Sequence, residues 1–211
     1  MKHFNNITTL IFDFGGVIIN LDLPQCIQNF KNLGLDNFEQ HLSLFGQKDF
    51  FLQFEIGQIG TKEFRANIRK LCPKPLTDTQ IDEAWCSFLC DIPNEKLEML
   101  LDLKKKFRVL MLSNTNPLHI EVSAAREFSR LGKTRDDFFD KCYLSYEMKL
   151  AKPNPVIFET LLADAGVSAD ECLFLDDGLK NIEVAQELWI QSYLVKPNED
   201  LSFLLNPETW K

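Results

Sequence analysis

The hydrophobic positions of the chain follow two different patterns. A largely apolar run at residues 7–13 ends in Asp13, shorter apolar runs recur at residues 109–112 and 173–175, and two further candidate strands lie at residues 141–144 and 191–195. Apolar runs that do not alternate with polar residues are typical of strands buried on both faces of a parallel sheet. Helix signals separate the later runs, so the chain is predicted to be α/β, with a doubly wound parallel sheet and right-handed crossovers.

Residues 20–92 show a helical pattern instead. Their large aromatic residues recur at roughly helical intervals: Phe30, Phe38, Phe45, Phe50, Phe51, Phe54, Phe64, Trp85 and Phe88. Thr77 and Gln80 have the spacing of a capping box before another helix. We therefore predict an α-helical layer at 20–92, inserted after the first strand of a Rossmann-like core formed by residues 1–19 and 93–211.

Helix ends are also marked in the second half of the chain. Leu97, Leu100 and Leu101 share one helical face. Asn154 and Pro155 have the residue types of an N-cap and a first helical position, and Gly166 is a typical C-terminal stop. The segment around His119, which follows the second core strand, is expected to be a loop.

Composition and charge exclude several classes of partner. The chain has 211 residues, 45% of them hydrophobic, with a net charge of −8 and a pI of about 5.0. Such an acidic protein is a poor ligand for nucleic acid, and no apolar run is long enough to span a membrane. The six cysteines form no CxxC pair, which favours reduced thiols in a cytoplasmic protein. The sequence is compatible with a monomer or a homodimer.

Polar side chains follow the predicted strands where the chemistry of an α/β protein is usually found. They are Asp13, Ser113 with Asn114, Lys152, and the pair Asp176 and Asp177. The carboxyl ends of parallel strands meet at one edge, so these groups are expected to converge. Clustered carboxylates repel one another unless a cation joins them, and Mg²⁺ is the natural one. An aspartate is also a competent nucleophile toward phosphorus.

Each of these residues also has a plain structural interpretation. Asp13 could cap a helix, the Ser113–Asn116 segment could be an ordinary turn, and Lys152 could be a solvated lysine. The order and spacing of the whole set favour function more strongly than any single member does. The set points to phosphoryl transfer to a carboxylate, with a lysine and a hydroxyl holding the phosphoryl oxygens.

In this order, the motifs resemble the haloacid dehalogenase-like hydrolase superfamily. They are Asp13-Phe-Gly-Gly-Val, Leu-Ser113-Asn-Thr, Lys152-Pro and Leu-Asp176-Asp177-x-x-x-Asn181. The insert at 20–92 resembles the cap of that family. Three further features resemble its bacterial branch of α-D-glucose-1-phosphate phosphatases: Asn114-Thr-Asn-x-x-His119, Glu55-x-Gly57-x-Ile59, and Trp85.

The resemblance implies a role for each matching residue. Asp13 would be the nucleophile and a Mg²⁺ ligand, together with the carbonyl of Gly15 and with Asp177, while Asp176 would bind the ion directly or through water. Ser113 and Lys152 would be catalytic groups that hold the phosphoryl group, and Asn114 would orient it. The expected substrate is a small phosphorylated metabolite such as an aldose 1-phosphate. The Phe45–Phe54 stretch, Glu55 and the segment around His119 are candidates for substrate selection, although a structural role is favoured for His119, for Trp85 and for most of the phenylalanines.

Gly15 departs from the family pattern, because most phosphatases of the family have an aspartate there as general acid and base. Losing such a group typically costs about 10²–10⁴-fold in rate. We therefore expect slow turnover or a substrate whose leaving group needs little protonation, such as an anomeric oxygen, and we do not expect a phosphomutase. Two alternatives remain: a 2-haloacid dehalogenase, which also lacks that aspartate, and a non-catalytic binding protein of the same fold.

Overall fold

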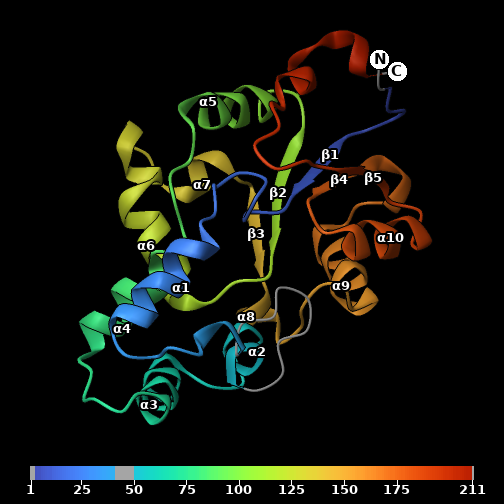
Figure 1. Ribbon diagram of the computed structural model, residues 1–211. Helices are drawn as coiled ribbons and strands as arrows, with labels where there is room; N and C mark the ends of the chain where they lie inside the picture. The colour runs from blue at the N-terminus through green and yellow to red at the C-terminus, as the bar shows by residue number, and fades with distance from the viewer. Residues whose placement is uncertain (1–2, 41–49, 211) are drawn as a thin grey trace.

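The computed structural model describes residues 3–40 and 50–210, and its centre is a five-stranded, fully parallel sheet (Figure 1). The strands lie in the order β3-β2-β1-β4-β5. They are β1 (Thr9–Phe12), β2 (Arg108–Ser113), β3 (Lys141–Leu144), β4 (Cys172–Asp176) and β5 (Gln191–Leu194). All five predicted strands are present, and the predicted α/β fold is confirmed. The first strand is shorter than the apolar run that predicted it.

Helices cover both faces of the sheet. The core helices are α5 (Asn94–Leu103), α6 (Pro117–Arg126), α7 (Arg135–Phe138), α8 (Ser145–Met148), α9 (Pro155–Ala165) and α10 (Leu179–Glu187). Leu10 and Phe12 of β1 belong to a core cluster with residues of α5 and α7, whereas Ile11 belongs to one with residues of α9 and α10. Successive residues of a strand point to opposite faces, so α5 and α7 pack on one face and α9 and α10 on the other.

Between β1 and β2 the chain forms a helical layer with a hydrophobic core of its own. Its helices are α1 (Leu23–Asn32), α2 (Phe50–Glu55), α3 (Thr61–Leu71) and α4 (Asp78–Cys86). Most of its predicted aromatic residues are buried and in contact with one another; Phe51, for example, packs against Phe64 and Trp85. Phe45 lies outside the described residues. The predicted capping box forms, because Gln80 N–H bonds to Thr77 and the Gln80 side chain bonds back.

Two antiparallel chain segments connect the helical layer to the sheet. Leu21 forms a bridge with Leu89, the Asn20 N–H donates to the Asp91 carbonyl, and the Cys90 N–H donates to the Asn20 carbonyl. The segment that leads into the helical layer is therefore hydrogen-bonded to the segment that leads out of it. The helical layer is held beside the carboxyl ends of the strands, on the side where α8 lies (Figure 1).

Short 3-10 helices complete the described chain: Phe38–Gln40, Phe128–Leu131, Ala169–Glu171, Ser202–Leu205 and Pro207–Thr209. One expectation is wrong, because the segment around His119 is not a loop but the first turn of α6. Asn116 caps this helix by accepting the His119 N–H at 3.1 Å, and Pro117 takes the first helical position. Within the described residues, the structure contains no helix long and apolar enough to cross a membrane.

Candidate active site

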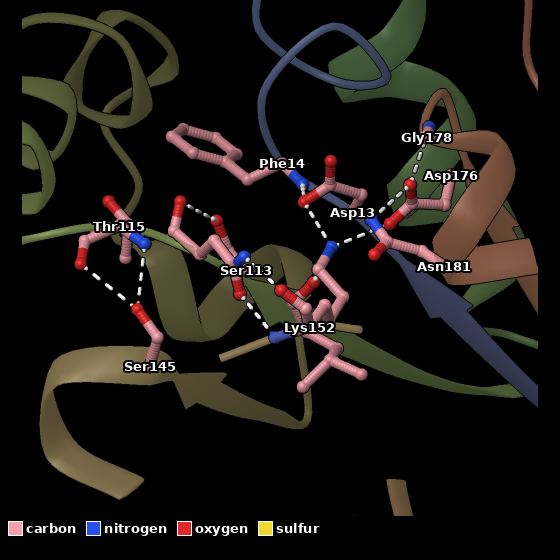
Figure 2. Close-up of polar contacts among 11 residues, drawn as sticks. Asp13, Phe14, Ser113, Thr115, Ser145, Lys152, Asp176, Gly178 and Asn181 are labelled. Carbon is pink, nitrogen blue, oxygen red and sulfur yellow. Dashed lines mark hydrogen bonds and ion pairs between the residues drawn. The ribbon is translucent and has the colours of Figure 1, made fainter. Parts of the chain in front are cut away.

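Three neighbouring strands bring the predicted catalytic carboxylates and hydroxyl to one edge of the sheet (Figure 2). Asp13 follows β1 directly, and Ser113 and Asp176 are the last residues of β2 and β4. The Asp13 N–H donates to the Leu175 carbonyl at 2.9 Å, which fixes the backbone of Asp13 to the end of β4. The local apolar sequence forms the strands, and the parallel pairing of the strands places their polar ends together.

Lys152 is the centre of the cluster. Its Nζ lies 2.8 Å from Asp13 Oδ1 and 2.6 Å from Asp176 Oδ2, and it donates to the Leu112 carbonyl at 2.9 Å. All three ammonium protons thus have acceptors, which a buried lysine needs. The other Asp176 oxygen accepts the Gly178 N–H at 2.7 Å and the Asn181 side-chain amide at 2.8 Å. Asp176 is therefore held firmly in one orientation.

The charges of this cluster are strongly coupled. Burial raises the pKa of Asp13 to about 7; Lys152 lowers it, and the charges of Asp176 and Asp177 raise it. Burial also raises the pKa of Asp177, with a further increase from Asp176. Burial alone would lower the pKa of Lys152, but the attraction of Asp13 and Asp176 outweighs it, so this pKa is raised. One ammonium does not balance three carboxylates, and the cluster favours an added cation.

The carboxylates fit a divalent metal ion. Asp13, Asp176 and Asp177 each offer an oxygen, and these oxygens lie within 4.8 Å of one another. Mg²⁺ prefers hard oxygen ligands from one or two carboxylates together with water and phosphate. Because both Asp176 oxygens are already occupied by Lys152, Gly178 and Asn181, Asp13 and Asp177 have more freedom to bind the ion directly.

Gly16 supports this arrangement by its size. Its φ of +73° lies in the left-handed region, and a Cβ there would lie 2.3 Å from Asp177 Oδ2. A side chain at position 16 would be strained by this φ and would displace the Asp177 carboxylate. The second glycine after Asp13 therefore lets the Asp13 turn and the Asp177 carboxylate come together.

On the β2 side, Asn114 contacts the backbone of Lys152. Its Nδ2 donates to the Lys152 carbonyl at 2.9 Å, and its Oδ1 accepts the Lys152 N–H at 2.8 Å. Both ends of the amide are thus used to hold Lys152 in place. Ser113, by contrast, is buried, and among the residues that the structure describes its hydroxyl makes one long contact, 3.5 Å to the Asn114 carbonyl, so it is available to a ligand.

Ser145 is a residue of this region that the sequence analysis missed. It follows β3, and its hydroxyl accepts the Thr115 N–H at 2.9 Å (Figure 2). The signal was present, since Ser145 is a polar residue at the end of a predicted strand, as Asp13 and Ser113 are. The expectation of a structural His119 agrees with its burial against the Trp85 ring, with ring centroids 4.9 Å apart, and with the 3.3 Å contact of Nε2 to the Trp85 carbonyl.

The fold and this edge of the sheet define a hydrolase with an aspartate–lysine–carboxylate centre. The model of the haloacid dehalogenase-like hydrolases matches residues 7–188, and the chain belongs to that family. The resemblance seen in the motifs is thereby confirmed for the superfamily.

Individual relatives extend along nearly the whole chain. It is 36% identical over 204 residues to D-ribitol-5-phosphate phosphatase of Bacteroides thetaiotaomicron, covering 95% of this chain and 99% of the relative. A haloacid dehalogenase family enzyme of the same species, crystallised with magnesium and inorganic phosphate, is 47% identical, with a TM-score of 0.90 and coverage of 95% and 100%. A predicted hydrolase of the family from Porphyromonas gingivalis is 35% identical, with a TM-score of 0.87 and coverage of 95% and 98%.

These comparisons agree with the expectations at the level of enzyme class. The predicted phosphatase class is confirmed by the family and by the named relative, and the predicted cofactor, Mg²⁺, is the ion in the related crystal structure. The glucose-1-phosphate branch is not among the relatives reported, so that part of the expectation stays a prediction.

Proposed function

We propose that this chain is a Mg²⁺-dependent phosphomonoesterase that acts on a small sugar phosphate through an aspartyl-phosphate at Asp13. The observation that carries the proposal is the pairing of Asp13 with Lys152 beside Asp176 and Asp177 at the ends of the central strands. An ammonium 2.8 Å from Asp13 Oδ1 favours the charged carboxylate, which is the form that attacks.

The proposed reaction has two steps. An Asp13 oxygen forms a bond to phosphorus while the ester P–O bond breaks and the alkoxide leaves. Water then attacks the same phosphorus, which releases inorganic phosphate and the free carboxylate. Asp13, Asp177 and the Gly15 carbonyl would hold Mg²⁺, with Asp176 binding it directly or through water, and the ion would supply positive charge for the phosphoryl oxygens. Because Gly15 has no acidic side chain, the leaving oxygen takes its proton from water.

The remaining predicted residues have supporting roles in this proposal. Lys152 neutralises charge at Asp13 and at the phosphoryl group, and the Ser113 hydroxyl donates to a phosphoryl oxygen. Asn114 acts through Lys152, since both ends of its amide bond the Lys152 backbone. This assignment differs from the direct phosphate contact expected for Asn114.

We further propose that residues 20–92 form a cap over the core of residues 1–19 and 93–211 and select the substrate. The helical layer has its own hydrophobic cluster, to which the core contributes Leu118 of α6, and this supports the division. Two substrate types are supported. The missing acid at position 15 favours an aldose 1-phosphate with its good leaving group, and the 36% identical relative is named for an open-chain polyol phosphate. A cytoplasmic location is supported by the six free thiols.

A substrate panel tests the proposal. Phosphate release is measured from aldose 1-phosphates, pentitol 5-phosphates, nucleotides and short phosphoesters, with and without Mg²⁺. Asp13→Asn should abolish release, whereas Asp102→Asn should not, because Asp102 is an exposed residue of α5 that pairs with Lys105 at 2.5 Å on the surface. Release that persists in EDTA and in Asp13→Asn would refute the mechanism.

The two alternatives from the sequence give different outcomes in the same experiment. Halide release from 2-haloacids without Mg²⁺ would identify a dehalogenase, and the Asp176–Asp177 pair argues against it because that reaction needs no metal. Phosphate binding without turnover of any substrate would identify a binding protein.

A further inference from the structure

Ser145, the first residue of α8, is a fully buried serine that joins two segments far apart in the sequence. Its Oγ accepts the Thr115 N–H at 2.9 Å, and its proton has two acceptors within reach, the Glu55 carbonyl at 2.6 Å and the Thr115 carbonyl at 3.1 Å (Figure 2 shows the Thr115 side). A hydroxyl has one proton and two acceptor lone pairs, so it forms both bonds at once. One buried hydroxyl thus connects the end of β2 with the end of α2 in the helical layer.

The segment after α2 is attached to α8 at a second place. We call residues 55–57 the cap turn. Gly57 has a φ of +61°, and a Cβ there would lie 2.2 Å from the Tyr146 carbonyl oxygen. The Gly57 carbonyl also accepts from Lys149 Nζ at 2.7 Å. The backbone of the cap turn therefore rests against α8 so closely that only glycine fits at position 57.

The same short segment of chain leads to the catalytic lysine. Leu150 N–H donates to the Ser145 carbonyl at 3.3 Å, and two residues later Lys152 is bonded to Asn114. We call residues 113–115 the phosphate loop. Residues 145–152 therefore contact the cap turn through Ser145 and Lys149, and the phosphate loop through Ser145 and Lys152.

We propose that Ser145 is a positioning residue that couples the seating of the cap turn to the geometry of the phosphate loop. The inference rests on the proposed function in taking residues 113–115 as the loop that binds phosphate. When the cap turn is seated, the Ser145 hydroxyl points its proton at the Glu55 carbonyl and its lone pair at the Thr115 N–H. When the cap turn is displaced, the Ser145 proton turns to its other acceptor, the Thr115 carbonyl, and the position of Thr115 in the phosphate loop changes with it.

A double-mutant cycle tests this coupling. Gly57→Ala displaces the cap turn, and Ser145→Ala removes the connection. The matched control is Gly132→Ala, because Gly132 has a similar φ of +64° but nothing lies within 4 Å of its added Cβ. The control therefore has the same backbone strain without the displacement. Dissociation constants of inorganic phosphate are measured by calorimetry in the presence of Mg²⁺ for each protein.

The inference predicts a specific pattern. Gly57→Ala should weaken phosphate binding by about fivefold when Ser145 is present, which corresponds to the loss of about one hydrogen bond. In the Ser145→Ala protein the same glycine substitution should change binding by less than about twofold, because the connection is already absent. Gly132→Ala should have an effect below about twofold in both backgrounds. If Ser145 had a purely structural role, Ser145→Ala would lower stability, but the effect of Gly57→Ala on phosphate binding would not depend on Ser145.

Equal effects of Gly57→Ala in the two backgrounds would overturn the inference and leave the proposed function standing. Failure of the unaltered protein to bind phosphate would overturn both. If Ser145→Ala does not fold, amide exchange decides: Gly57→Ala should speed exchange of the Thr115 N–H by at least about fivefold relative to Gly132→Ala. Unchanged Thr115 exchange in Gly57→Ala would overturn the inference.

Discussion

One buried histidine, His119, should contribute less to stability as the pH is lowered. Its ring stacks on Trp85 where α4 of the helical layer meets α6 of the core. Burial lowers the pKa of His119 from 6.5 to about 4, and the bond to the Trp85 carbonyl opposes that shift only in part. Below pH 6.5 the unfolded chain therefore binds a proton at His119, whereas the folded chain binds that proton only below about pH 4. Stability is lost as the pH falls through that window.

The size of the effect follows from these two values. Between pH 7 and pH 5 the unfolded histidine becomes almost fully protonated, while the folded one stays mostly neutral. With a pKa of 6.5 unfolded and about 4 folded, the contribution of His119 to the free energy of unfolding should fall by about 2 kcal/mol over that interval. The loss is a difference in proton binding, so it does not depend on how much the ring contributes by packing.

Chemical denaturation of the wild type and of His119→Gln isolates this contribution. Glutamine keeps a side-chain N–H for the Trp85 carbonyl and does not titrate. The loss of ring stacking in the variant changes stability by the same amount at every pH, and the other two histidines of the chain are present in both proteins. The difference in unfolding free energy between the two proteins should therefore shrink by about 2 kcal/mol from pH 7 to pH 5. A difference that does not change with pH would refute the reasoning.

Two further predictions concern the site. Lys152→Met should lower the free energy of unfolding, measured in urea, by about 3–5 kcal/mol, because it leaves Asp13 and Asp176 buried without their cation. Added Mg²⁺ should recover part of this loss of stability. A variant as stable as the wild type would contradict the ion-pair geometry. Gly16→Ala should weaken Mg²⁺ binding by about tenfold in calorimetry, because its Cβ would lie 2.3 Å from Asp177 Oδ2, and unchanged affinity would place the ion elsewhere.

The sequence was most informative where the signal is local. Short segments rich in apolar residues predicted all five strands, and the capping pairs Thr77–Gln80 and Asn154–Pro155 predicted two helix starts that the structure contains. The convergence of Asp13, Ser113 and Asp176 followed from a topological rule, since the ends of adjacent parallel strands meet. Local apolar patterning and topology are enough to place these groups.

The features that could not be predicted depend on contacts between distant residues. Ser145 bonds the carbonyl of Glu55, 90 residues earlier, and a backbone carbonyl has no sequence signature. The use of both ends of the Asn114 amide on Lys152 likewise depends on the loop after β3 folding back toward β2. The misassigned loop at His119 has a local cause, because the run Ser113–Asn116 is rich in turn formers, and the Asn116–Pro117 helix start was overlooked.

The central claim is that Asp13 is phosphorylated during turnover. The most direct measurement is rapid acid quenching of the enzyme with Mg²⁺ and its best substrate from the panel, followed by mass spectrometry of the peptide that contains Asp13. The account predicts a phosphoryl group on that peptide during turnover, absent without Mg²⁺ and absent in Asp13→Asn. Mg²⁺-dependent phosphate release from a wild-type enzyme whose Asp13 peptide is never phosphorylated at any quench time would contradict it.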